Sequence, residues 1–216
     1  MSEYRFMNQL IEKEHIPTPA YVFDLDKMKE FAEKVKRCLT GKAEICYAMK
    51  ANPFLIKPML EIVSSLEVCS PGEFRICERA GIPMEKIVLS GVYKNPDDIA
   101  YMLDTYGNRG TYTVESLQHL KVLNDTAVRH GITLSVLIRV TSGNQFGIDE
   151  AEIRKIISER EKYTGIEIEG IQFYSGTQKR NLSQMQEELK HLDTFIRELE
   201  EIGGMEIRTL EYGPGF

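Results

Sequence analysis

The sequence predicts an α/β fold of the (β/α)8 TIM-barrel type, on three observations. Segments with strand and helix patterns alternate along the chain with short links, which is typical of a parallel sheet. Many of the strand-like segments are continuously apolar, as expected when both faces of a sheet are buried. A Gly-x-Gly-x-x-Gly motif after the first strand is missing, which favours the barrel over the other candidate, an open doubly wound sheet.

Eight segments have the apolar, β-branched or aromatic composition of strands. In chain order they are residues 20–23, 44–48, 66–69, 87–90, 110–114, 134–140, 166–174 and 208–212. Without the N-terminal segment 20–23, seven strands of the βα type remain, whereas a closed barrel needs eight. The sequence has no linker, repeat or low-complexity segment, so we expect one barrel domain over residues 1–216 that stops before an eighth strand.

The segments between the strands have the patterns of helices. They are residues 26–39, 56–65, 71–80, 97–105, 115–130, 149–163 and 183–202. Several carry the residues that are typical of helix ends. Pro71 begins one of them and Gly81 ends it, while Gly131 and the pair Gly203-Gly204 end two others.

Composition excludes several classes of function. Of 216 residues, 42% are hydrophobic and 28% charged, which is typical of a globular domain. The net charge of −6 argues against a nucleic-acid surface, and no apolar run approaches the ~18 residues of a membrane span. The first residues, MSEYRF, lack the pattern of a secretory signal, so we expect a cytoplasmic protein.

Cysteine and histidine positions give little sign of a disulfide or a metal site. The four cysteines form no C-x-x-C pair, and we expect buried thiols in a reducing compartment. They are Cys38, Cys46, Cys69 and Cys77. The four histidines are scattered and none has the spacing of a metal ligand pair, so no metal is expected.

Chemically useful residues gather where the predicted strands end, which is the functional end of such a barrel. They are Lys50, residues 70–73 (SPGE), Ser90-Gly91, Glu115-Ser116, Arg139, residues 174–177 (YSGT) and residues 213–215 (GPG). An amine, a guanidinium and small-residue turns suit a small anionic ligand such as a phosphate. The same residues also have an ordinary interpretation, in which the glycines form turns, Lys50 is a solvated charge, and Glu73 and Glu115 stabilise the first turn of a helix.

These strand ends lie in motifs that resemble those of the fold-type III pyridoxal phosphate (PLP) decarboxylases, the group of diaminopimelate and ornithine decarboxylases with an alanine-racemase-like barrel. Residues 18–24 (TPAYVFD) look like the opening strand of the family, and residues 47–52 (YAMKAN) match its Y-A-x-K-A-N. Further matches, in family order, are 67–73 with D-x-x-S-x-G-E, 114–116 with N-V-D-S, 138–140 with R-I/V-N, 146–148 with K-F-G-I, 170–178 with G-x-H-F-H-x-G-S-Q, and 210–216 with D-x-G-G-G-F.

The resemblance implies roles for particular residues. Lys50 would carry PLP as a Schiff base, and the reacting amine must be free of its proton, which desolvation and neighbouring positive charge favour. Thr177, Gly213 and Gly215 would hold the phosphate, although Pro214 removes one N–H donor from that loop.

The ring of the cofactor would meet other residues. Tyr174 stands where the family has a histidine against the ring, and an aromatic ring can still stack there. It is also readable as a plain core residue. Glu67 and Arg139 would hydrogen-bond around the ring side, or else form structural ion pairs.

Family members are about twice as long as this chain and continue to an eighth strand with E-P-G-R and a C-terminal β-domain, which complete a homodimer. We therefore expect a fragment, a truncated product or half of a split enzyme with little decarboxylase activity on its own. The substrate would be an amino acid. The alternatives are a non-catalytic PLP homeostasis protein, an amino-acid racemase, and a structural domain that has lost the cofactor.

Overall fold

The computed structural model describes residues 3–177, 179 and 181–213, which divide into two units, Met1–Ile45 and Cys46–Phe216. Pro214 and Gly215, which we expect in the phosphate loop, lie outside the described residues. Each unit is described by itself. Within the described part of the chain, every helix is too short or too polar to cross a bilayer.

The first unit contains two helices, α1 (Glu3–Lys13) and α2 (Leu25–Leu39). Helix α2 confirms the predicted helix 26–39, and the Asp24 side chain caps it by accepting a hydrogen bond from the Lys27 N–H at 3.0 Å. The predicted strand 20–23 is wrong, because no described strand pairs with this segment. Unpaired backbone there stays open to solvent, and Tyr21 is 95% exposed.

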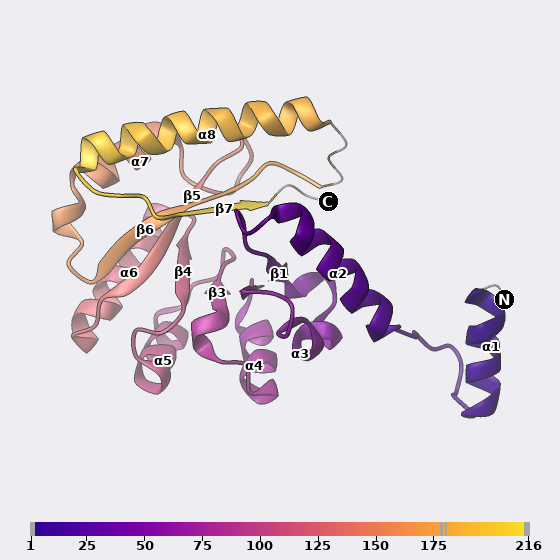
Figure 1. The fold of residues 1–216 in the computed structure, drawn as a ribbon. Coiled ribbons are helices and arrows are strands. Elements are labelled where there is room, and N and C mark those ends of the chain that lie inside the picture. The colour runs from indigo at the N-terminus through magenta and orange to yellow at the C-terminus, as the bar shows by residue number, and fades with distance from the viewer. Residues whose placement is uncertain (1–2, 178, 180, 214–216) are drawn as a thin grey trace. The chain divides into compact units, whose positions relative to one another are not determined.

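The second unit is built on one parallel sheet of seven strands, arranged in chain order from β1 to β7 (Figure 1). The strands are β1 (Cys46–Ala48), β2 (Ser65–Val68), β3 (Ile87–Leu89), β4 (Thr111–Val114), β5 (Leu134–Val140), β6 (Ile166–Tyr174) and β7 (Thr209–Gly213). Each pairs in parallel with the next strand, as βα repetition predicts. The seven βα-type strands of the sequence prediction are therefore confirmed.

Helices follow the strands as predicted, with two exceptions in length: the predicted helix 149–163 ends at Ser158, before a separate 3-10 turn over Arg160–Lys162, and the predicted helix 56–65 is also shorter. They are α3 (Ile56–Met59), α4 (Pro71–Ala80), α5 (Pro96–Tyr106), α6 (Leu117–His130), α7 (Glu150–Ser158) and α8 (Leu182–Gly203). The predicted helix 56–65 is four residues long, because β2 already begins at Ser65 and the chain needs a turn before it.

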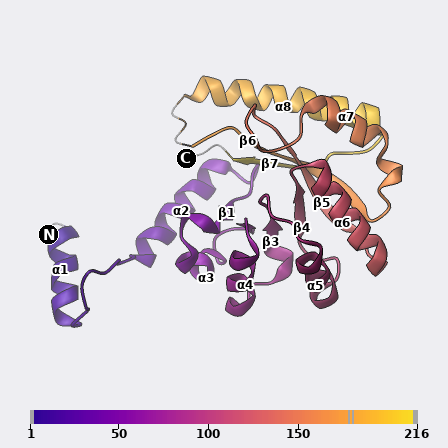
Figure 2. The same cartoon turned by 180° about the vertical axis from the view of Figure 1, so that it is seen from behind.

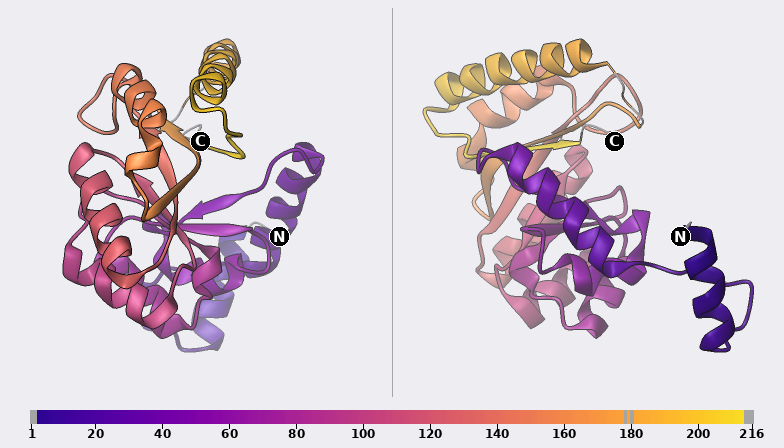
Figure 3. Two further views of the ribbon diagram at one scale, coloured as in Figure 1. Left: turned by 90° about the vertical axis from the view of Figure 1, so that its left-hand side faces the viewer. Right: turned by 45° about the vertical axis from the view of Figure 1, so that its right-hand side comes forward.

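The seven strands curl into part of a barrel, with helices on the outer face (Figures 1 and 3). Strand residues alternate between the two faces, so Val68, Tyr112 and Ile138 are buried on the side of the helices. On the inner face, the Gln172 Nε2 of β6 donates to Ser90 Oγ, just past β3, at 3.3 Å. Because β3 and β6 are not neighbours, this contact joins residues across the curve of the sheet.

Polar contacts join successive helices on the outer face of the sheet. Figure 2 shows these helices from behind. Glu78 of α4 accepts hydrogen bonds from the hydroxyls of Tyr101 and Tyr106 on α5. Arg154 of α7 pairs with Glu198 of α8 at 2.7 Å. These bonds hold the helices in order around the sheet, so that the loops after the strands keep fixed places.

The cysteines differ from the expectation of buried thiols. Cys77 is buried, but Cys46 and Cys69 are only partly buried and Cys38 is exposed; all four are free. The expectation is wrong for Cys38 because it lies on a helix of the first unit with only Ala32 buried.

Candidate functional site

The inner face of the sheet carries polar side chains near the carboxyl ends of its strands. They are Lys50, Glu67, Cys69, Ser90, Thr113, Glu115, Arg139, Gln172, Tyr174 and Glu211. Parallel strands place all these ends at one rim of the barrel, which is why residues far apart in the sequence meet. This rim is the candidate site, and it contains Lys50, Glu67, Arg139 and Tyr174 of the sequence prediction.

Lys50 lies in a single 3-10 turn, Met49–Ala51, directly after β1. Its Nζ is 3.3 Å from Glu67 Oε2 and 3.7 Å from Cys69 Sγ, both at the end of β2. The Lys50 side chain is 57% exposed, whereas that of Glu67 is 17% exposed. The amine therefore reaches solvent or a ligand, while the carboxylate holds it from the barrel side.

The charge beside Lys50 is negative. Burial lowers the pKa of Lys50, but the charge and hydrogen bond of Glu67, together with Cys69, outweigh burial and raise the pKa above the ordinary value. The structure places Lys50 at the rim, and the charged group 3.3 Å from its amine is an acid, not the positive charge that would favour the free amine.

A second acid, Glu211 of β7, lies on the same side of the barrel. It stands in register with Gln172 of β6, whose Nε2 donates to Glu211 Oε2 at 3.0 Å. Burial, and then the negative charge of Glu67, raise the pKa of Glu211 to about 7. Gln172 also has a buried Oε1 with no partner among the described residues. This oxygen is therefore available to accept a hydrogen bond from a protonated Glu211 or from a ligand.

Sequence reasoning assigned no role to Glu211. Its position was a sign that could have been used, because Glu211 stands where the motif matched at 210–216 has its acidic residue.

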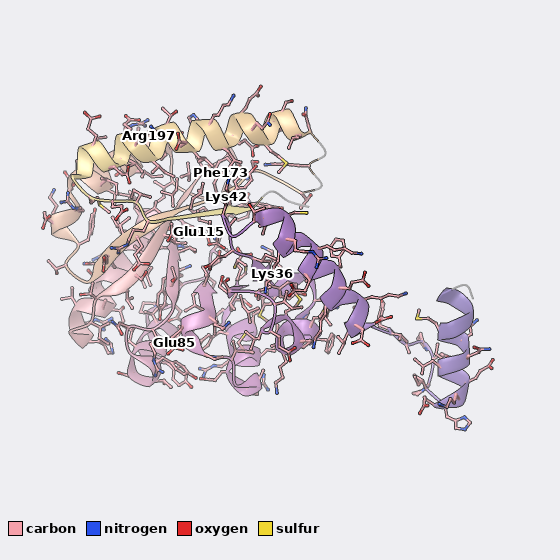
Figure 4. All side chains as sticks on the ribbon, in the orientation of Figure 1. Lys36, Lys42, Glu85, Glu115, Phe173 and Arg197 are labelled. Atoms are coloured by element: carbon pink, nitrogen blue, oxygen red, sulfur yellow. The ribbon has the colours of Figure 1, made fainter. Side chains whose placement is uncertain are left out.

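Arg139 of β5 is paired with Glu115, which follows β4 and is labelled in Figure 4. Arg139 Nη1 is 2.8 Å from Glu115 Oε2, and the two side chains are 14% and 2% exposed. Thr113 Oγ1 adds a hydrogen bond to Glu115 Oε1 at 3.3 Å. A buried ion pair of this kind needs such further bonds to offset the removal of water from both charges.

Lys94 is a residue that sequence reasoning missed. It lies in the loop between β3 and α5, and its Nζ donates to the Gly91 carbonyl at 2.8 Å and lies 3.5 Å from Thr113 Oγ1. Burial lowers the pKa of this amine to about 8, although the charge of Glu115 acts in the opposite sense. The sequence carried no signal for it, because a lysine in a loop is ordinarily solvated.

Glu73, which we expected to support the site or a helix, caps α4. Ser70 Oγ accepts from the Glu73 N–H at 3.2 Å, and Glu73 Oε2 accepts from the Cys69 N–H at 2.7 Å. This arrangement is close to a capping box, with the difference that Glu73 accepts from Cys69, the residue before the N-cap Ser70. It fixes the backbone of Cys69, and thereby the end of β2 on which Lys50 rests.

Tyr174 and Gly213 lie opposite one another at the ends of β6 and β7. A side chain at Gly213 would put its Cβ 2.7 Å from Tyr174 Cδ2, so only glycine lets the tyrosine ring lie there. Thr177 follows in an exposed loop that, with Lys179 and the start of α8, lines an open hollow. The structure thus brings Tyr174 and Gly213 together and leaves Thr177 at the adjoining loop.

Glu188 of α8 ties this end of the rim together. Its Oε1 accepts from Ser175 Oγ at 2.7 Å, and its Oε2 accepts from the Tyr212 hydroxyl at 2.7 Å and pairs with Lys179. Tyr212 also stacks on Phe173, which is labelled in Figure 4, with ring centroids 6.4 Å apart. The loop after β6 is therefore fastened both to α8 and to β7.

Comparison with known proteins gives one family and a consistent set of relatives. The family model described as "Pyridoxal-dependent decarboxylase, pyridoxal binding domain" matches residues 25–216. A diaminopimelate decarboxylase from Aquifex aeolicus is 31% identical over an alignment of 215 positions that covers 92% of this chain and 50% of the relative.

Solved structures agree with this result. The diaminopimelate decarboxylase from Helicobacter pylori, complexed with L-lysine, superposes with a TM-score of 0.80 at 25% identity and covers 96% of this chain and 55% of its own. SrLDC in complex with PLP and cadaverine gives 0.83 at 25% identity, over 100% of this chain and 54% of its own. This chain spans about half the length of the relatives it matches. These relatives are decarboxylases, so they give no support to the alternative of a non-catalytic PLP homeostasis protein.

Proposed function

This chain belongs to the pyridoxal-dependent decarboxylases through their pyridoxal-binding domain, and from this premise we propose that it forms the PLP-binding part of an amino-acid decarboxylase of the diaminopimelate/ornithine type. The observation that carries the proposal is the contact at the end of β1. There Lys50, in the YAMKAN stretch, presents a partly exposed amine 3.3 Å from Glu67. A lysine so placed is what an aldehyde cofactor requires.

The residues at the rim fit a phosphorylated aromatic aldehyde. Lys50 supplies the amine, and Tyr174 supplies an aromatic ring beside Gly213. Arg139 uses its Nη1 on Glu115 and keeps further N–H donors for a ligand on the ring side. A buried acceptor, Gln172 Oε1, is also left for a donor. This set of groups matches the ring, the aldehyde and the charge of PLP.

In this proposal Lys50 would hold the cofactor through its aldehyde as a Schiff base, which forms with release of water. The amine must first lose a proton, and Glu67 Oε2 lies where it could hold that proton. Glu67 would also orient the Lys50 nitrogen from the barrel side. When bound, PLP supplies the electron sink for loss of CO2 from an amino acid.

The phosphate group would lie at the ends of β6 and β7. We assign its contacts to the Thr177 hydroxyl and to the backbone N–H groups of Gly213 and Gly215. The Glu188 bonds to Ser175 and Tyr212 fasten this region, which supports a pre-formed cradle. Tyr174 lies where the family has histidine, and it would stack on the ring without the positive charge that an imidazole can carry.

The activity, the amino-acid substrate and the homodimer are proposals for the whole enzyme, since the chain spans about half the length of its relatives. We propose that residues 1–216 are the PLP-binding barrel part, that an eighth strand and a β-domain complete the enzyme, and that this chain alone has little activity. We also propose a cytoplasmic location.

The test is an absorbance spectrum of the chain with PLP, before and after borohydride, followed by mass spectrometry. We expect a yellow absorbance band and a borohydride-fixed adduct on the peptide that contains Lys50, and loss of both in Lys50→Ala. The matched control is Lys57→Ala, an exposed lysine seven residues later, which should keep both. A band that persists unchanged in Lys50→Ala would remove Lys50 from the proposal.

A further inference from the structure

Lys94 is a lysine of the rim whose position is fixed from several sides. The loop that carries it packs directly on the end of β2, because a Cβ at Gly91 would lie 2.1 Å from the Cys69 carbonyl oxygen. Gly91 has φ +90°, which a residue with a side chain rarely adopts. The loop therefore lies against the same residue whose Sγ contacts Lys50.

His119 of α6 holds the loop from the other side. Its Nδ1 accepts from the Glu115 N–H at 3.3 Å, and its Nε2 is 2.9 Å from the Val92 carbonyl oxygen. These partners require a proton on Nε2 and none on Nδ1, which is the neutral ring. Burial, and then the charge of Lys94, lower the pKa of His119, which agrees with that form.

The charged and titratable groups that face Lys94 are Cys69, Glu115, His119 and Arg139. His119 is neutral, and burial raises the pKa of Cys69 to about 11, so its thiol is neutral at ordinary pH as well. Lys94, Glu115 and Arg139 remain. One carboxylate stands between two cations, and Thr113 Oγ1 contacts both Lys94 and Glu115. The group carries one net positive charge when Lys94 is protonated.

A buried amine with this arrangement is an unusual choice for packing alone. Desolvation disfavours its charged form, and a methionine would fill similar space without that cost. Perturbed groups of this kind concentrate at functional sites. The net positive charge lies at the rim, two strands along the sheet from Lys50. It can therefore act on an anion bound there.

We propose that Lys94 is a positioning residue of the cofactor site, which holds the Glu115–Arg139 pair through Thr113 and supplies positive charge to an anionic pyridoxal-type ligand at the rim. This inference rests on the proposed function. It adds a second lysine that does not bond to the cofactor, and it makes binding depend on the charge of that lysine. The charge is present below about pH 8 and is lost above it.

The experiment measures the binding of pyridoxine 5′-phosphate by calorimetry. This probe has an alcohol in place of the aldehyde, so it does not react with Lys50. Wild type, Lys94→Met and Lys94→Arg are compared at about pH 6.5 and about pH 9.5, which lie roughly 1.5 units on either side of the Lys94 pKa. Lys121→Met is the matched control, because Lys121 is an exposed lysine on α6 paired with Asp125.

At the lower pH we expect Lys94→Met to bind the probe about tenfold more weakly than wild type. At the higher pH the difference should shrink to about twofold, because wild-type Lys94 is then neutral. Lys94→Arg should stay within about threefold of wild type at the lower pH and bind more tightly than wild type at the higher pH. Lys121→Met should match wild type at both.

Each other outcome overturns the inference. If wild type binds the probe and Lys94→Met binds equally, Lys94 has no part in the site while the proposed function stands. A loss that is the same at both pH values would make the role structural. If Lys94→Met does not fold, wild type and Lys94→Arg still decide, because an unchanged ratio of their affinities across the pH range contradicts it. If wild type does not bind the probe, the proposed function falls as well.

Discussion

Two lysines at the same rim have opposite electrostatic settings. Lys50, after β1, lies beside the carboxylate of Glu67, and Glu211 adds a second acid on that side of the barrel. Lys94, after β3, faces Glu115 but shares it with Arg139. The pKa of Lys50 is raised, whereas the pKa of Lys94 is lowered to about 8.

The difference shows that burial alone does not decide the charge of a lysine in this site. Burial lowers the pKa of both amines. For Lys50 the unshared Glu67 carboxylate and Cys69 together outweigh burial, while for Lys94 the Glu115 carboxylate is already neutralised by the Arg139 guanidinium. The residue proposed to react with the cofactor is thus the one whose proton is held more firmly. Removal of that proton becomes a step that Glu67 must assist.

The largest effect should come from removing the second acid on the Lys50 side with Glu211→Gln. Burial raises the pKa of Glu211 from 4.5 to about 7, so between these values the folded protein holds a proton that the unfolded chain has lost. The stability that this group contributes is present below about pH 4.5 and is lost as pH rises to about 7. Glutamine does not titrate, so the variant should be more stable than wild type by about 3 kcal/mol at about pH 8 and similar at about pH 4.5.

Urea unfolding of the ligand-free chain at both pH values measures this. Glu201→Gln, an exposed acid on α8, is the matched control and should leave stability unchanged at both. A variant that is less stable than wild type at the higher pH would mean that Glu211 is ionised and well paired. The pKa of Glu211 would then not be raised, and Lys50 would have two ionised carboxylates on its side of the barrel instead of one.

The next effect separates the two lysines directly. In Glu67→Gln the pKa of Lys50 should fall, because the opposite charge at 3.3 Å is gone and burial still acts. The pKa of Lys94 should not change. The measurement is the pH dependence of the rate at which each lysine is acetylated, followed by mass spectrometry of the two peptides.

Glu115→Gln is the reciprocal control for the lysine pair. It should lower the pKa of Lys94 further and leave that of Lys50 in place, since Glu115 acts on Lys94 alone of the two. If either substitution shifts the pKa values of both lysines equally, the rim is one electrostatic unit. The claim that the two lysines have separate electrostatic settings would then be wrong.

Much of the fold could be predicted from the sequence, and the limits are physical. Strands β5 and β6 have the predicted bounds, because long runs between glycine-bounded turns constrain both ends. Segment 20–23 has strand composition but forms no strand, because a strand also needs a neighbour to accept its hydrogen bonds. Amino-acid composition shows whether a segment favours the strand conformation, but it does not show whether a neighbouring strand is there to pair with it.

The candidate site divides in the same way. Lys50 and Glu67 could be expected to meet, because both end parallel strands that are neighbours in the chain. The pairing of Arg139 with Glu115, and the inward turn of Lys94, depend on side-chain directions in a loop and across the sheet. No spacing in the sequence encodes those directions, so the resemblance could point to Lys50 as the candidate cofactor lysine but could not point to Lys94.

The smallest effect tests whether the charges of Lys50 and Lys94 are set only by residues in the β1–β5 part of the rim. Tyr212→Phe removes the hydroxyl that donates to Glu188 Oε2 at 2.7 Å and keeps the ring that stacks on Phe173. We expect a loss of about 1 kcal/mol in the free energy of unfolding, and unchanged acetylation profiles for Lys50 and Lys94.

Tyr112→Phe is the matched control, because the Tyr112 hydroxyl is buried without a partner among the described residues. Removing that hydroxyl should be neutral or slightly stabilising, since no bond is lost and an unsatisfied group disappears. Equal losses in the two variants would show that the Glu188 bond adds nothing beyond the packing of a tyrosine. A shifted lysine profile in Tyr212→Phe would show that the far end of the rim takes part in setting the two charges.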